Sequence, residues 1–337
     1  MQTPRAREDS WVLILVLLLG AAALVPIWAT PYPPLQDLPN HLLKTDLLHR
    51  WLTGEDWDPS IYALHLKLLP NYTVYAALLL LSPLFSLMAS AKIFLSLIVV
   101  TLPLSTYIFL RRVNPENTLF APAAATLNFS LFFMMGSMNF CMALALYPWA
   151  LALFASERRA GAGNWLPFAA VATLIYFTHG FVFLVLLGSV ICLLGLHRRM
   201  ANLPRTLGLL PGLICFAINL TESFKAEARP SASVKPFLAI PGLHTVHNGL
   251  VWILAPHGRG LDTPFGLAWL LVLGACALLV LAQAIREWRA KESWDRVFSR
   301  HGWLVIACLL MVSFFFPPVQ VGEWSHARPR FVPFAVL

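Results

Sequence analysis

Residues 11–30 read WVLILVLLLGAAALVPIWAT, and Arg5 and Arg7 precede them. An apolar run of about 20 residues matches the thickness of the hydrocarbon layer of a bilayer, so this stretch predicts a spanning helix. The run is long for a signal peptide, and Pro31-Tyr32-Pro33-Pro34 follows it where a small-residue cleavage site would stand. We therefore expect an uncleaved first span with its N-terminus in the cytoplasm.

The composition extends this expectation to the whole chain. Hydrophobic residues make up 58% of the sequence and charged residues 12%, against about 45–50% and about 25% in soluble domains. Further runs that predict spans are 93–110, 118–134, 139–156, 165–178, 180–196, 206–221, 264–285 and 302–318. With no internal repeat that would indicate a solenoid, we expect one all-α domain over residues 1–337. It would be a polytopic transmembrane helical bundle of about 9–11 membrane helices, with juxtamembrane helices in its first outer loop.

The basic excess fits a membrane protein. The chain has 24 Lys and Arg against 16 Asp and Glu. In a soluble chain this would suggest nucleic acid, but here it fits cytoplasmic loops and contact with anionic membrane lipids, so we expect no nucleic-acid partner. All five cysteines lie inside apolar runs, which indicates packing residues and not a disulfide or metal framework.

The basic clusters also decide the topology of residues 72–110. We expect two apolar runs, 72–89 and 93–110, with a short break at Ser90-Ala91-Lys92. If only the second run spans, Arg111-Arg112 falls in the cytoplasm. The other basic clusters then lie on that side too, namely Arg158-Arg159, His197-Arg198-Arg199 and the segment 286–300. We therefore expect residues 72–89 to insert only partly, from the outer face.

This layout places two loops, 31–69 and 222–262, on the extracytoplasmic face, together with turns near Met135-Gly136-Ser137 and His179-Gly180. We expect a bacterial cytoplasmic (inner) membrane, because no organelle-targeting segment is recognisable. Residues 331–337 begin a further apolar run and then stop. That ending predicts a C-terminal part beyond the sequence.

Within the first loop, Pro39 suits the first turn of a helix and Gly54 suits its end. The residues between them divide into an apolar face that includes Leu43 and Trp51 and a polar face that includes Lys44. This pattern is typical of a helix that lies on the bilayer surface.

Asp37 and His41 begin this helix and stand four residues apart, a spacing that places both on one helical face. A carboxylate beside an imidazole at the membrane surface can act as general base for an alcohol or can hold a divalent metal ion. The alternative is that Asp37 simply caps the helix.

An outer-face Asp-x-x-x-His after the first span resembles the GT-C-type membrane glycosyltransferases, which include protein O-mannosyltransferases, aminoarabinose transferases and oligosaccharyltransferases. Pro70-Asn71-Tyr72-Thr73-Val74-Tyr75, at the start of an apolar helix, is similar to the Pro-x-x-Tyr helix in the same loop of that superfamily. The span that ends in Tyr107-Ile108-Phe109-Leu110-Arg111-Arg112 is also similar. The resemblance covers most of the chain as a layout, although its motifs are short.

The resemblance implies transfer of a sugar from a polyprenyl-phosphate donor on the outer face, with Asp37 as base or metal ligand and His41 in an accompanying role. The acceptor, whether glycan, lipid or protein, is left open. Many members carry a second acid in the next outer turn, whereas this chain has Met134-Met135-Gly136-Ser137-Met138-Asn139. A two-acid metal site is thereby in doubt, and a single base fits better, with Mg²⁺ or Mn²⁺ still open as a cofactor.

Polyprenyl phosphate needs positive charge on its phosphate as it leaves. Arg328 and Arg330, with the neighbouring His326, stand at the outer edge of the last apolar stretch and could grip a phosphate. The alternative is that these arginines reach towards lipid headgroups. His179, at the outer junction of two spans, is a further substrate-binding candidate; the alternative is a hydrogen-bonded packing histidine.

In loop 222–262, His244 and His247 lie among Gly and Pro residues, which favours a mobile cover for an acceptor site over metal ligation. No phosphate-binding glycine loop or nucleophile elbow occurs, so a soluble nucleotide-sugar donor has no recognisable site. Two alternatives remain, a transporter or flippase for a lipid-linked or amphipathic solute and a non-catalytic membrane assembly protein. Transporters tend to carry charges near the midplane, whereas this chain concentrates its polar groups at one face, which favours surface chemistry.

Overall fold

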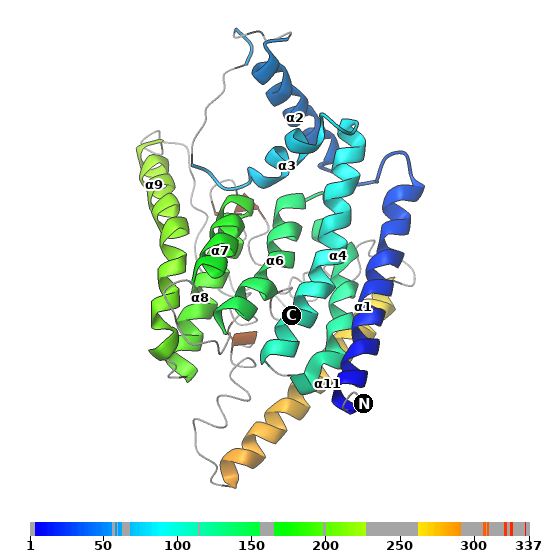
Figure 1. Cartoon of the computed structure of the whole chain (residues 1–337), viewed down its shortest axis with the longest axis vertical. Coiled ribbons are helices and arrows are strands. Elements are labelled where there is room, and N and C mark those ends of the chain that lie inside the picture. The colour runs from blue at the N-terminus through cyan, green and yellow to red at the C-terminus, as the bar shows by residue number, and fades with distance from the viewer. Residues whose placement is uncertain are drawn as a thin grey trace.

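In the computed structural model, the described residues are 4–55, 58, 60–62, 68–113, 115–155, 165–197, 200–226, 262–290, 306–307, 309, 320–321, 324–325 and 334. They form an α-helical membrane bundle (Figure 1). Within these ranges the strands are two residues long each, β1 (Gln320–Val321) paired antiparallel with β2 (Trp324–Ser325).

The helices follow the apolar runs of the sequence. They are α1 (Pro4–Ala29), α2 (Leu38–Thr53), α3 (Thr73–Leu81), α4 (Leu87–Val113), η1 (Pro115–Phe129), α5 (Leu131–Met134), α6 (Met138–Phe154), α7 (Leu166–Thr178), α8 (Gly180–His197), η2 (Met200–Leu209), α9 (Leu210–Ala226) and α11 (Asp262–Arg289). Three described segments are long and apolar enough to cross a bilayer, namely Ser10–Ala29, Leu87–Val113 and Leu203–Thr221. Shorter apolar helices accompany them at Met138–Phe154, Leu166–Thr178 and Gly180–Leu194.

Helix α6 forms the centre of the bundle, and almost all of its side chains are buried. It packs against α4 on one side and against α7 and α8 on the other (Figure 1). Its small residues Ala143, Ala145 and Ala150 are fully buried, which lets the neighbouring backbones approach closely. The Ser105 hydroxyl of α4 donates to the Ala145 carbonyl at 2.6 Å, a polar contact that fixes the register of the two helices.

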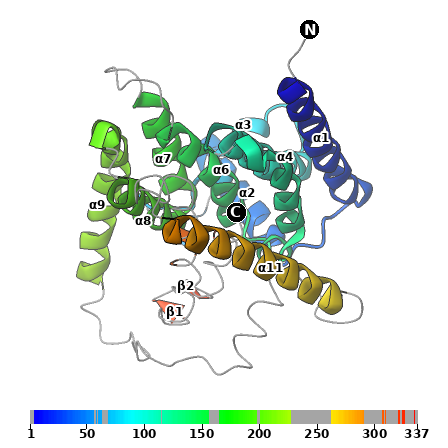
Figure 2. The same cartoon turned by 90° about the horizontal axis from the view of Figure 1, so that it is seen from below.

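The two ends of the bundle differ. The N-terminal end of α1 and the C-terminal end of α4 lie together, whereas α2 and α3 stand at the opposite end, which we call the α2 end (Figure 1). Seen from below, α7, α8 and α9 lie on the far side of α6 from α1 (Figure 2). Arg111 and Arg112 therefore lie at the same end of the bundle as the start of α1, as the basic clusters predict.

The break expected at Ser90-Ala91-Lys92 is wrong. Those residues lie inside the continuous helix α4, and the chain breaks instead between the end of α3 and Leu87. The Ser86 hydroxyl accepts a hydrogen bond from the Ala89 backbone N–H at 3.2 Å, so Ser86 caps the start of α4. With nine residues, α3 is about 14 Å long, too short to cross a hydrocarbon layer about 30 Å thick, so partial insertion remains the expectation for this region.

The run at 118–134 has an unexpected form, a 3₁₀ helix, η1, followed by the short α5. A 3₁₀ helix rises about 2.0 Å per residue, so the 15 residues of η1 extend about 30 Å, close to the thickness of the hydrocarbon layer. The side-chain amide of Asn128 donates to the Val99 carbonyl at 2.8 Å and anchors η1 on α4. Asn128-Phe129-Ser130 matches the acceptor pattern for N-glycosylation. Asn128 is almost fully buried, so this site is closed to glycosylation in the folded chain.

Candidate functional site

The segment after α1, residues 30–37, contacts the turn between α5 and α6 through backbone hydrogen bonds. The Gln36 backbone N–H donates to the Met134 carbonyl at 3.1 Å, and the Asp37 backbone N–H donates to the Met135 carbonyl at 3.0 Å. The structure therefore brings the segment after α1 and the turn between α5 and α6 together, directly beside the start of the central helix α6. The sequence placed both on one face but gave no indication that they touch.

Gly136 makes this close approach feasible. Its φ is +78°, a conformation that residues with a Cβ rarely adopt. A Cβ at this position would also lie 2.8 Å from the Asp37 backbone nitrogen. Both the backbone conformation and the space require glycine here.

The Asp37 side chain is half-buried and does not cap α2. Asp37 occupies the residue before the helix, with φ −93° and ψ −1°, and its carboxylate makes no capping hydrogen bond. Helix α2 starts instead with Pro39 in its first turn and ends at Gly54, which has φ 74°; both were expected. Within the part of the chain that the structure describes, the Asp37 carboxylate has no hydrogen bond and no ion pair, so it is available to an external group.

His41 joins three parts of the site. Its Nε2 lies 3.1 Å from the Gly136 carbonyl oxygen, and its Nδ1 lies 3.2 Å from the Tyr75 hydroxyl. Because a carbonyl can only accept, Nε2 carries the proton in this arrangement. Nδ1 then holds the lone pair and accepts from the Tyr75 O–H. One imidazole thus ties α2 to α3 and to the turn before α6.

The pKa shifts agree with this assignment. Burial lowers the pKa of His41 below its ordinary value; the hydrogen bond to Gly136 and the charge of Asp37 oppose the shift, and Lys44 adds to it. Burial, with the nearby charge of Asp37, raises the pKa of Tyr75. Both groups are therefore uncharged near neutral pH.

A metal held jointly by Asp37 and His41 does not fit this geometry. The lone pair of the neutral imidazole already accepts from Tyr75, whereas a metal ligand needs that lone pair free. The described residues also contain no group of three or more His, Cys, Asp or Glu side chains close enough to share a metal ion.

Asn139, 5% exposed, holds the start of α3 in place. Its side-chain amide donates to the Asn71 carbonyl at 3.0 Å and accepts from the Val74 N–H at 3.1 Å. Asn71 itself has φ 73°, a left-handed conformation that asparagine tolerates. Tyr75 extends from the first turn of the helix secured in this way.

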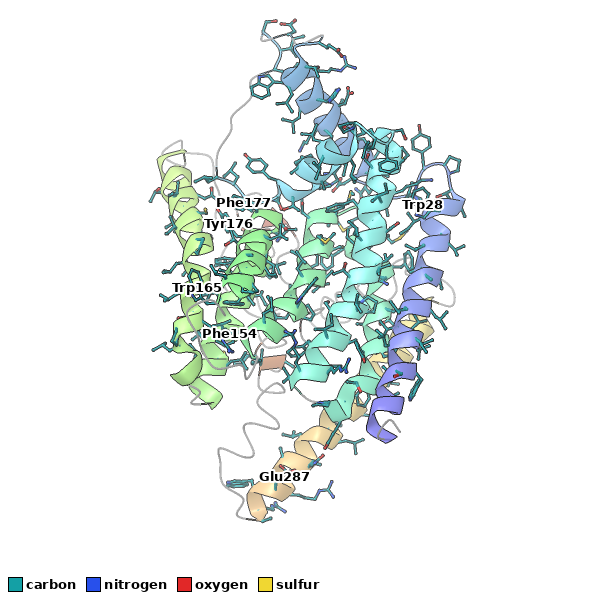
Figure 3. All side chains as sticks on the ribbon, in the orientation of Figure 1. Trp28, Phe154, Trp165, Tyr176, Phe177 and Glu287 are labelled. Carbon is teal, nitrogen blue, oxygen red and sulfur yellow. The ribbon has the colours of Figure 1, made fainter. Side chains whose placement is uncertain are left out.

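Helix α7 provides a second support for α3. The Tyr72 N–H donates to the Phe177 carbonyl at 3.0 Å, and the hydroxyls of Thr73 and Thr178 lie 2.8 Å apart. The neighbouring Tyr176 hydroxyl donates to the Leu68 carbonyl at 2.9 Å. Figure 3 labels Tyr176 and Phe177 near the α2 end of α7, where these contacts are made.

His179 lies, as expected, at the junction of α7 and α8, where its extended backbone (φ −161°) separates the two helices. It is buried, and its ring packs edge-on against Phe140, 5.4 Å between centroids. Phe334 from the last apolar stretch packs against the same Phe140 and against Tyr147. His179 therefore belongs to an aromatic cluster over α6 and α8.

Three predicted phosphate-binding residues, His326, Arg328 and Arg330, lie outside the described residues, as does most of loop 222–262. The residues that sequence reasoning missed are Tyr75, Gly136 and Asn139. A polar amide inside an apolar run was the available signal for Asn139. The partnership of Tyr75 and Gly136 with His41 depends on tertiary contacts that no local pattern encodes.

No family model, curated protein or solved structure matches the chain.

Proposed function

We propose that the chain is an integral-membrane glycosyltransferase that moves a sugar from a polyprenyl-phosphate donor to an acceptor hydroxyl at the α2 end, with Asp37 as general base. One observation on Asp37 carries the proposal. The Asp37 backbone is held by the turn before α6, while its carboxylate has no partner among the described residues. A fixed, unpartnered carboxylate at the membrane surface suits proton transfer from an external hydroxyl.

The reaction needs one base. Asp37 takes the proton of the acceptor hydroxyl as that oxygen forms a bond to the anomeric carbon of the sugar. The bond between the anomeric carbon and the phosphate oxygen breaks, and polyprenyl phosphate leaves with the bonding electrons. The protonated Asp37 then returns its proton to water. Phosphate is a good leaving group, so a second carboxylate that protonates the leaving oxygen, as in ordinary glycosidases, is not required.

His41 and Tyr75 position the base in this proposal. The His41 lone pair accepts from Tyr75, so the imidazole is not the base in this arrangement. Its two hydrogen bonds instead hold α2, α3 and the Gly136 turn together around Asp37. We expect their loss to lower the rate by misplacing the carboxylate, because small displacements of a catalytic group reduce rates strongly.

The α2 end is the extracytoplasmic face in this proposal, and the membrane is a bacterial cytoplasmic membrane. At the opposite end, Arg205 donates to the Phe154 carbonyl at 2.8 Å, and Arg111 and Arg112 end α4. Basic residues gathered at one end favour a cytoplasmic location for that end. The proposed phosphate contacts remain Arg328, Arg330 and His326. Phe334, four residues after Arg330, packs against Phe140 of α6.

The proposal is tested by sugar transfer in membranes that contain the full-length protein. Labelled polyprenyl-phosphate sugars are supplied, and Asp37→Asn is compared with Asp46→Asn. Asp46 lies on the same helix but pairs with Arg50 at the surface, so its loss should leave transfer intact. Equal activity of the two variants would refute the role of Asp37.

A further inference from the structure

A buried lysine lies where α1 and α4 meet near the α2 end. Lys92 is 8% exposed, and its ammonium donates to the Thr30 carbonyl. The same ammonium lies 5.6 Å from the ring centroid of Trp28. The Trp28 indole N–H in turn donates to the Ser96 hydroxyl at 3.0 Å. We call Trp28, Thr30, Lys92 and Ser96 the α1/α4 cluster.

The charge of Lys92 is not neutralised within the cluster. An ammonium has three N–H donors, and the Thr30 carbonyl takes one of them. Across the described ranges, no carboxylate pairs with Lys92. Burying a charge without a counter-ion is costly, and the face of Trp28 offsets this cost only in part.

A purely structural role explains part of this arrangement. The Thr30 carbonyl follows the end of α1, where a positive charge interacts favourably with the helix dipole. A neutral donor would also satisfy that carbonyl, without the cost of a buried charge. The two remaining N–H donors of Lys92 are suited to an anion.

The level of the cluster in the membrane indicates which anion. The span Ser10–Ala29 ends between Trp28 and Thr30, so the cluster lies at the boundary between hydrocarbon and headgroups. Trp28 and Tyr32 are both exposed, as expected for aromatic residues at such a boundary. Figure 3 shows Trp28 at the end of α1 that leads towards α2. Lipid phosphates occupy this level.

We propose that Lys92, with Trp28, binds the phosphate of an anionic lipid headgroup in the leaflet at the α2 end. The phosphate chemistry is common to a phospholipid and to a polyprenyl phosphate. Thr30 begins the segment that carries Asp37, so the bound lipid also steadies the approach to the candidate site. This inference does not require sugar transfer.

The test measures lipid binding to full-length protein purified in uncharged detergent, by native mass spectrometry. Phosphatidylglycerol, polyprenyl phosphate and uncharged diacylglycerol are titrated separately. The variants are Lys92→Gln, Lys92→Arg and, as control, Lys44→Gln, which removes an exposed lysine on α2. A charge-assisted hydrogen bond corresponds to about tenfold or more in affinity. We expect Lys92→Gln to bind the phosphate-bearing lipids about tenfold or more weakly than the wild type does. Lys92→Arg and Lys44→Gln should keep most of the wild-type affinity.

The outcomes separate clearly. Tighter binding of polyprenyl phosphate than of phosphatidylglycerol identifies the source as a lipid-linked substrate, and the reverse identifies a structural phospholipid. Equal affinity of wild type and Lys92→Gln for both phosphate lipids overturns the proposal. If Lys92→Gln does not fold, the wild type alone provides the test. The proposal is then overturned if the wild type binds diacylglycerol as tightly as it binds the phosphate lipids.

Discussion

A Cβ atom on Gly136 would stand 2.8 Å from the backbone nitrogen of Asp37. The turn before α6 therefore packs closely against the segment 30–37. The position of the proposed base, Asp37, thus depends on Gly136, a residue far along the chain. The Asp37 N–H bond to the Met135 carbonyl, 3.0 Å long, belongs to the same contact.

This contact predicts that Gly136→Ala is more harmful than Gly54→Ala. Both glycines have a similar positive φ, +78° and +74°, but a Cβ on Gly54 meets no atom within 4 Å. Gly54→Ala should cost about 1–2 kcal/mol of stability from backbone conformation alone. Gly136→Ala adds a steric clash and should lower both the unfolding temperature and the transfer rate further. If Gly136→Ala and Gly54→Ala lower the unfolding temperature equally, the turn does not pack tightly against Asp37.

The burial of His41 predicts a pH dependence of stability. Because burial lowers its pKa, the unfolded chain binds the imidazole proton more tightly than the folded chain does. His41 therefore destabilises the fold as pH falls through the ordinary imidazole pKa, and this effect is absent above that pKa. Between about pH 7.5 and about pH 5, the unfolding temperature of the wild type should fall more than that of His41→Gln.

The matched control for this prediction is His49→Gln, because His49 lies on the same helix but is exposed. The unfolding temperature of His49→Gln should fall with pH by as much as that of the wild type. If His41→Gln also follows the wild type over the whole range, His41 is not the group responsible.

Asn139 should be a stability residue with an indirect effect on activity. Asn139→Ala leaves the Asn71 carbonyl and the Val74 N–H without their partner, and each unsatisfied buried group costs about 1–3 kcal/mol. Asn40→Ala, at an exposed position on α2, should cost much less. Urea or thermal unfolding of the two variants measures the difference, and a cost for Asn139→Ala no larger than that for Asn40→Ala would contradict the bridging role.

The sequence was sufficient for the class of fold, the main helices, the limits of α2 and the junction at His179, because these follow from apolar length, Pro39 and Gly54. It misplaced the break before α4, since the serine cap at Ser86 is a weaker signal than the lysine inside the run. It predicted Asp37 and His41 as site residues from their spacing, from their place after the first span and from the resemblance to the GT-C superfamily. The contacts of His41 with Tyr75 and Gly136 depend on packing between distant segments, which local patterns do not encode.

The arrangement of α1 and α4 predicts the topology. A reporter fused after Arg112 should indicate the cytoplasm, because the end of α4 lies beside the start of α1 (Figure 1). A reporter inserted after Gly54 should indicate the opposite compartment. Signals from one compartment at both positions would contradict the assignment of the α2 end to the outer face.

The central claim is that Asp37 acts as the base in sugar transfer. The most direct measurement is the initial rate of transfer from a polyprenyl-phosphate sugar by Asp37→Asn, with Asp46→Asn beside it at equal protein level. Loss of a general base typically reduces a rate by about 10²–10⁴-fold, so Asp37→Asn should fall in this range while Asp46→Asn stays within about twofold of wild type. Wild-type transfer by Asp37→Asn would contradict the claim.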